Sequence, residues 1–220
     1  MRSVTRKARP DPTPDTTSTT DLVVSALEKL LNQGESFTAL SIEQIAKNAG
    51  IARATFYLHF RNKGELVGQL MKRVGKEMRN AAKDSVADRT YPVREDFLQF
   101  MKNAIDVKYR HRAAIRAIVE TASYDPDVAQ VYQAFMEQMV GDTRQFIAKL
   151  QATGRAHPDV SLELADVLTW AAERCCNQLL KDGDSLATRH KLAQSLTHVV
   201  WNSIAAPAVG ETKKATSNRL

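Results

Sequence analysis

The feature that most constrains the fold is a pair of helix-start signals with a glycine between them. Ser41 and Gln44 have the spacing of a capping box, in which each side chain satisfies a free backbone amide at a helix start. Asn62 and Glu65 repeat that spacing where a longer apolar pattern begins. Gly50 lies between the two signals, and glycine readily adopts the left-handed backbone of a tight turn. Two short helices joined in this way predict a helix-turn-helix.

Apolar residues recur at helical spacing along most of the chain. This period predicts one helix from residue 21 to Gly34, before the helix-turn-helix, and a long one over residues 63–87 after it. Beyond Pro92 it predicts five more helices and no strand, with Asp125 and Ser161 as caps of the seventh and eighth. The sequence therefore predicts an all-α fold of about nine helices, with a three-helix domain at residues 21–66 and a larger helical domain at 67–206.

The two ends of the chain have a different composition. Residues 1–20 are basic, rich in Pro and Thr, and almost without apolar residues, and residues 207–220 are similarly polar. Such segments cannot repay the entropy of ordering, so they are predicted to be a disordered basic arm and a disordered tail. Neither a signal peptide nor an apolar run of the roughly 20 residues that span a bilayer is present, which favours a cytoplasmic protein with no membrane partner.

The two cysteines give no sign of a metal or redox site. Cys175 and Cys176 are adjacent within a predicted helix, so they lack the spacing of a zinc or redox site, and no cofactor is expected.

The charge is distributed unevenly along the chain. Of the net charge of +6, most is N-terminal, since residues 1–80 carry thirteen Lys and Arg against eight Asp and Glu. This asymmetry favours a polyanionic partner for the first third of the chain.

Residues 40–66 resemble the helix-turn-helix of the TetR family of transcriptional regulators. The matching residues are Ile45, Ala46, Ala49, Gly50, Thr55, Phe56, Tyr57, Phe60 and Lys63. Ala52 departs from the pattern, which often has Ser there. The resemblance implies a sequence-specific repressor that binds double-stranded DNA and is released from it by a small hydrophobic effector.

Six residues are candidates for DNA contacts. Arg53, Thr55 and Tyr57 lie on or near the exposed face of the predicted recognition helix, where Arg53 could read a guanine or contact a phosphate. Ser41 and Lys63 lie at helix N-termini, which favour phosphate. By the resemblance His59 contacts phosphate, and a solvated histidine is the alternative.

The larger domain resembles the branch of the family that contains the mycobacterial ethionamide-resistance regulator. The resemblance rests on residues 128–140 and 196–201 and on Glu173 and Arg174. It implies an elongated apolar pocket, although each aromatic or Met residue alone is also typical of an ordinary core. Candidates for its lining are Phe97, Met101, Tyr132, Phe135, Met139, Thr143, Thr169, Trp170, Ala172 and Glu173. Thr169 and Ala172 replace amide side chains of that regulator, so its ligand cannot be carried over.

The last two long helices form the dimer interface in the family. They carry more apolar residues than a monomer is expected to leave exposed, and a homodimer implies a palindromic operator. Candidates for the interface are Leu164, Leu168, Leu179, Leu192, Leu196, Val200 and Ile204.

Two other function classes compete with a repressor. A DNA-binding activator, or an architectural protein without an effector, would carry the same helix-turn-helix. An all-α enzyme is least favoured, because the sequence contains no HExxH, GxSxG, P-loop or GxGxxG motif and no catalytic residue is predicted.

Overall fold

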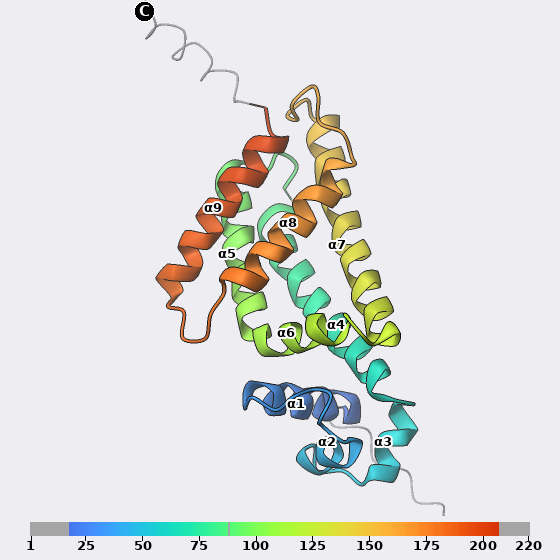
Figure 1. Cartoon of the computed structure of the whole chain (residues 1–220). Helices are drawn as coiled ribbons and strands as arrows, with labels where there is room; N and C mark the ends of the chain where they lie inside the picture. The colour runs from blue at the N-terminus through green and yellow to red at the C-terminus, as the bar shows by residue number, and fades with distance from the viewer. Residues whose placement is uncertain (1–17, 88, 207–220) are drawn as a thin grey trace, which may run out of the picture.

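The computed structural model describes residues 18–87 and 89–206, and this part of the chain consists of helices joined by loops (Figure 1). It forms nine α-helices and a short π-helix, and its only bridge of the β type joins Ala156 to Ala205. The predicted all-α fold is confirmed. Among the described residues, no helix has the length and apolar character needed to cross a membrane.

The N-terminal domain consists of α1 (Thr19–Asn32), α2 (Ile42–Asn48) and α3 (Arg53–His59). Helix α1 starts two residues before the predicted position, because the Ser18 side chain accepts a hydrogen bond from the amide of Asp21 and caps the helix. The rest of the predicted arm and the predicted tail lie outside the described residues. Gly50 joins α2 to α3 with a φ of 71°, as its place in the turn requires.

The helix-start signals work as local hydrogen bonds. The amide of Ser41 donates to Gln44 at 2.8 Å and its hydroxyl accepts from the Gln44 amide at 3.1 Å, which is a complete capping box. Asn62 accepts from the amide of Glu65 at 2.9 Å. The second box differs from the prediction, because the Glu65 carboxylate accepts from the amide of Arg61 instead of that of Asn62.

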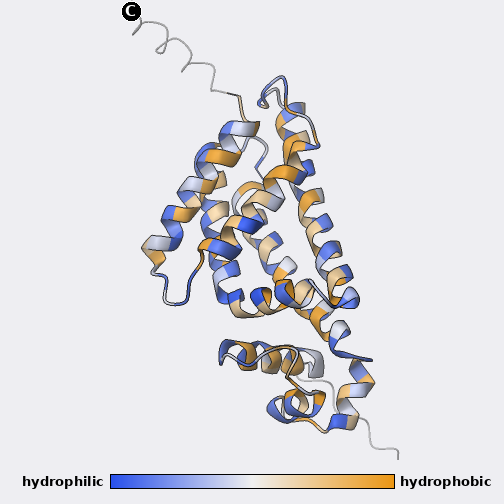
Figure 2. Cartoon of the chain, in the orientation of Figure 1, coloured by the Kyte–Doolittle hydropathy of each residue, from blue (hydrophilic) through white to orange (hydrophobic). Residues whose placement is uncertain are grey.

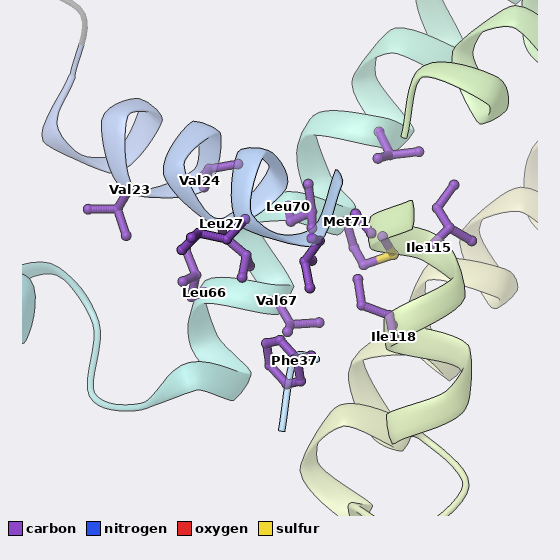
Figure 3. Packing of buried hydrophobic residues seen from close by; sticks show 14 of the residues in the cluster. Val23, Val24, Leu27, Phe37, Leu66, Val67, Leu70, Met71, Ile115 and Ile118 are labelled. Atoms are coloured by element: carbon purple, nitrogen blue, oxygen red, sulfur yellow. The ribbon is translucent and has the colours of Figure 1, made fainter. Parts of the chain in front are cut away.

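Helix α4 (Lys63–Ala82) belongs to both domains. Its first half buries Leu66, Val67 and Leu70 against α1, and Met71 lies beside Ile115 and Ile118 of α6 (Figure 3). It runs on into the larger domain, where residues Lys83–Ala87 widen into the π-helix η1. The helix predicted over residues 63–87 is therefore continuous in the chain but changes its hydrogen-bonding pattern at Lys83.

The larger domain contains α5 (Arg94–Arg110), α6 (Arg112–Thr121), α7 (Pro126–Ala152), α8 (Leu164–Leu179) and α9 (Leu186–Ile204). Asp125 caps α7 as predicted, by accepting hydrogen bonds from two amides. The prediction that Ser161 caps α8 is wrong. The Ser161 hydroxyl bonds to the Glu163 carboxylate, and residues 161–166 form short-range turns before and at the start of the helix.

Helices α8 and α9 place several of the predicted interface residues inside the chain. Both helices carry apolar residues among polar ones along their length (Figure 2). Leu168, Leu196, Val200 and Ile204 are buried in the core of the larger domain, together with Trp201, Phe97 and Ile147. These four side chains therefore add little exposed apolar surface to the chain, and their part in a dimer interface stays a prediction. The exposed apolar residues of the two helices are Val167, Trp170, Leu179, Leu186 and Val199.

Candidate DNA-binding surface and ligand cavity

Helix α3 has a buried side and an exposed side. Phe56 and Phe60 are fully buried, with ring centroids 5.1 Å apart, and attach the helix to α1 and α4. Arg53, Tyr57 and His59 are exposed, whereas Thr55 is half-buried. The structure thus gathers most of the predicted readers on the outer side of one short helix, next to the exposed Ser41 at the start of α2.

Arg53 and Tyr57 act as a pair on this surface. The Arg53 guanidinium lies 5.8 Å from the centre of the Tyr57 ring, and its hydrogen bond to Tyr57 is the main cause of its raised pKa. The two residues are one helical turn apart, so each restricts the rotamers of the other. An arginine that is held in position loses less conformational freedom when it binds a partner.

Lys63 is placed differently from the other candidates. Its ammonium donates to the carbonyl oxygens of Phe37 at 3.0 Å, Thr38 at 3.3 Å and Leu40 at 3.0 Å, and burial lowers its pKa. These bonds use all three N–H donors. Lys63 therefore ties the loop between α1 and α2 to the start of α4, and its phosphate contact stays a prediction.

Sequence reasoning missed one large exposed side chain of α3. Leu58 is 82% exposed, one turn after Ala54 and beside Tyr57. An apolar side chain on a helix that enters the major groove can contact the methyl group of thymine. The signal was present in the sequence, since a leucine on the polar side of a short amphipathic helix is out of register with its apolar positions.

The larger domain contains an elongated cavity of about 630 Å³. Residues of α4, η1, α5, α7, α8 and α9 line it, and most of its wall is apolar. Eight of the ten predicted lining residues meet there: Phe97, Met101, Phe135, Met139, Thr143, Thr169, Ala172 and Glu173. Tyr132 and Trp170 are not in the wall, and their rings pack edge to face at 6.2 Å.

The cavity opens between α4 and α7. Arg79, Lys83 and Gln145 are lining residues that are also exposed, so they mark its mouth. Asp142 lies beside them, where burial raises the pKa of its carboxyl group against the effect of Arg79. Halfway along the wall, Thr169 donates to Thr143 at 2.9 Å and Thr143 donates to the Met139 carbonyl at 3.0 Å, which satisfies both hydroxyl protons.

A buried ion pair lies at the other end of the cavity. Lys108 of α5 pairs with Glu173 of α8, and burial lowers the pKa of Lys108 to about 8. Sequence reasoning predicted Glu173 and missed Lys108. The signal was its place on the apolar stripe of α5, one turn after Ala104 and two turns after Met101.

A second cluster of charges links the two domains. His111, between α5 and α6, is buried and bonds through Nδ1 to Glu28 of α1. Its Nε2 lies 3.2 Å from Glu77 of α4. Arg73 donates to Glu28 at 3.1 Å and Arg110 donates to Glu77 at 2.7 Å. A protonated His111 can donate to both carboxylates, which attaches α1 to the larger domain.

The pKa values of this cluster predict a pH-dependent stability. Burial disfavours the His111 cation, but hydrogen bonds and charge interactions with Glu28 and Glu77 outweigh it and raise its pKa above 6.5. The contribution of His111 is then complete below pH 6.5 and disappears as the pH rises through the raised value. At about pH 6 we expect wild type to be more stable than His111→Gln by about 1 to 3 kcal/mol, and at about pH 9 the difference should shrink.

Urea denaturation of both proteins at several pH values measures this difference. Lys108 titrates in both proteins, so its effect largely cancels in the comparison. Glu77 contacts His111, but its pKa lies below 4.5 in wild type, so it stays ionised between pH 6 and 9. A difference that stays constant across the range would contradict the protonated link.

Two family models match the chain. The model of bacterial regulatory proteins of the tetR family matches residues 24–70, and the model of the C-terminal domain of the transcriptional regulator EthR matches residues 98–206. The HTH-type transcriptional regulator EthR of Mycolicibacterium smegmatis is 28% identical over 188 residues, which are 83% of this chain and 84% of that protein. EthR of Mycobacterium tuberculosis is 24% identical over 189 residues, 84% of this chain and 86% of that protein. These relatives are named as regulators of transcription.

Solved structures show the same fold. Salmonella enterica GusR has a TM-score of 0.69 at 18% identity and covers 84% of this chain and 95% of its own. NalD, described as the secondary repressor of a multidrug efflux pump in Pseudomonas aeruginosa, has a TM-score of 0.65 at 18% identity and covers 85% of this chain and 97% of its own. With the helix-turn-helix at one end and the EthR-type domain at the other, the chain belongs to the TetR family of DNA-binding transcriptional regulators.

Proposed function

We propose that this regulator is a cytoplasmic homodimeric repressor that a small hydrophobic effector releases from a palindromic operator. The observation that carries the proposal is the elongated apolar cavity, whose wall includes the second half of α4. The first half of the same helix lies in the core of the DNA-binding domain. A single helix therefore connects the two sites.

The connection supports a mechanism for release. Met78, Arg79 and Ala82 of α4 line the cavity. The Phe135 ring packs close to Gly75, since a Cβ atom added at Gly75 would lie 3.5 Å from it. A ligand that displaces Phe135 or the second half of α4 would tilt that helix, and Lys63 at its start would move the loop before α2. Release requires that the ligand bind the two dimer states unequally, and a tenfold change in operator affinity needs about 1.4 kcal/mol of difference.

The proposed operator contacts divide into two classes. Arg53, Thr55 and Tyr57, with Leu58 beside them, would face base edges, whereas Ser41 and His59 would contact phosphates. Lys63 would act on phosphate only by giving up a bond to a loop carbonyl, so its main role is to hold the loop.

We expect Arg53→Ala to weaken binding to the cognate operator by about 1–3 kcal/mol, because a bidentate guanine contact is lost. Binding to random DNA should change much less. Fluorescence anisotropy with both DNAs at one salt concentration measures the two effects. Lys47→Ala is the matched control, since Lys47 is also exposed but lies on α2. An equal loss on both DNAs would assign Arg53 to a phosphate.

The dimer interface would use the outer sides of α8 and α9. Val167 is 63% exposed and Val199 is 55% exposed, and Leu179 and Leu186 add to this apolar surface. Leu164 and Leu192 are half-buried and can contribute at its edge. Two protomers that share such a surface present two identical α3 helices, which fits a palindromic site.

The effector is tested with a variant that fills the cavity. We expect Met139→Trp to abolish ligand-induced thermal stabilisation and ligand-induced release of the operator, because the larger ring occupies the space of the ligand. At a ligand concentration of a hundred times its Kd, wild type should gain about 2.7 kcal/mol of stability and the variant none. A panel of lipophilic compounds is screened by thermal shift and then by operator binding.

Gln138→Trp is the control for this variant. Gln138 is exposed on the same helix and does not line the cavity, so it should respond to ligand like wild type. If no compound in a broad panel stabilises wild type or changes its operator affinity, the larger domain is a dimerisation core without an effector.

A further inference from the structure

The inner end of the cavity contains a positive charge in apolar surroundings. Lys108 lines the cavity, and the neighbouring lining residues Ala104, Ile105, Ala172 and Cys176 offer little polarity. The side chain of Lys108 is 12% exposed. Its partner Glu173 is 5% exposed, so the pair is separated from bulk water.

The carboxylate of Glu173 has three partners in the protein. Tyr132 donates to Oε1 at 3.0 Å and Asn177 donates to the same atom at 2.9 Å. The other oxygen, Oε2, pairs with Lys108. Glu173 therefore has a fixed position and little remaining capacity for a ligand.

The ammonium of Lys108, in contrast, has N–H donors without a protein acceptor in the described part of the chain. It carries three N–H donors, and Glu173 accepts from it through one oxygen. Among the described residues, no other acceptor bonds to its Nζ. Buried donors are normally satisfied, so the free N–H groups of Lys108 are available to a molecule in the cavity.

We propose that Lys108 donates a hydrogen bond to a neutral oxygen acceptor at the inner end of an otherwise apolar effector, such as a ketone or ester carbonyl. This inference rests on the proposed function, which supplies the effector. The ion pair is neutral overall, so a carboxylate ligand would meet the charge of Glu173 and an amine would meet that of Lys108. From Phe97 to Lys108 the wall follows α5 for about 16 Å, which favours an extended chain.

The test compares two ligands of equal length in two proteins. Methyl heptyl ketone carries the acceptor near one end, and nonane lacks it. The variant combines Lys108→Met with Glu173→Gln, so that Tyr132 and Asn177 keep an acceptor and no buried charge is left unpaired. The Kd of each compound is measured from its concentration in the headspace above the protein solution, by gas chromatography.

We expect the double variant to bind the ketone at least tenfold more weakly than wild type and to bind nonane with unchanged or higher affinity. Lys102→Met is the control, because it makes the same substitution on α5 outside the cavity wall. Circular dichroism checks that each variant is folded. If the double variant misfolds, wild type is tested alone against nonylamine, which should bind at least tenfold more weakly than the ketone.

Three outcomes would overturn the proposal, and they differ in what they say about the effector. If both compounds lose affinity equally in the variant, Lys108 contributes only to the shape of the cavity, and the proposed function stands. If wild type binds nonane and not the ketone, Lys108 does not bind an oxygen acceptor, and the proposed function again stands. If wild type binds neither compound, the acceptor hypothesis is wrong, and the broader panel with Met139→Trp decides separately whether any effector exists.

Discussion

Replacing Val199 with Glu is expected to give a folded monomer that binds the operator at least a hundredfold more weakly. Val199 is 55% exposed on the outer side of α9, so the charge does not disturb the core of the chain. In a symmetric dimer each interface residue occurs once in each protomer. Val199→Glu would therefore bury two unpaired carboxylates, which would oppose association. Separate protomers lose the gain in affinity of about 10² to 10⁴ that comes from binding two linked half-sites.

Light scattering and operator titration of the same samples measure both effects. Val93→Glu is the matched control, because Val93 is 40% exposed and lies before α5, on neither α8 nor α9. It should remain dimeric and bind the operator normally. A dimeric Val199→Glu with full affinity would place the interface elsewhere.

Replacing Leu196 with Glu, only three residues earlier, is expected to unfold the larger domain. Leu196 is 7% exposed and belongs to the same core as Trp201, Phe97 and Val140. A carboxylate at this position would be buried without a partner, and such changes belong to the small class that costs more than about 4 kcal/mol. Most domains have a total stability of only about 5–15 kcal/mol, so the loss would be close to complete.

Chemical denaturation followed by circular dichroism measures the loss. Leu196→Met is the control, since a swap of similar volume should cost less than about 1.5 kcal/mol. A Leu196→Glu protein that keeps its stability and is monomeric would mean that Leu196 faces a partner, as the sequence analysis predicted.

The helix-turn-helix could be predicted in detail because its signals are local. A cap acts over three or four residues, and the left-handed turn at Gly50 depends on one residue alone. The capping box of Ser41 and Gln44 therefore formed as the sequence predicted. Even here the sequence did not show one distant contact, since Lys63 reaches carbonyls 23 to 26 residues earlier in the chain.

The packing of the larger domain was harder to predict. Helical periodicity indicates which residues are buried, but it does not indicate which element covers them. Leu196 and Val199 are both apolar residues of α9, which packs on α5, but Leu196 is buried and Val199 is exposed. The hydrophobic effect has no direction, so a core, a cavity wall and a subunit interface use the same residue types.

The sequence by itself determined the all-α class, most helix boundaries and the helix-turn-helix, because caps, turns and apolar periods act over a few residues. Only the tertiary structure decided that Lys108 meets Glu173, that Met101 and Met139 line one cavity, and that His111 joins α1 to α4. These contacts join residues 34 to 83 positions apart. They depend on how whole helices pack, and packing is set by the sum of many weak contacts over the entire domain.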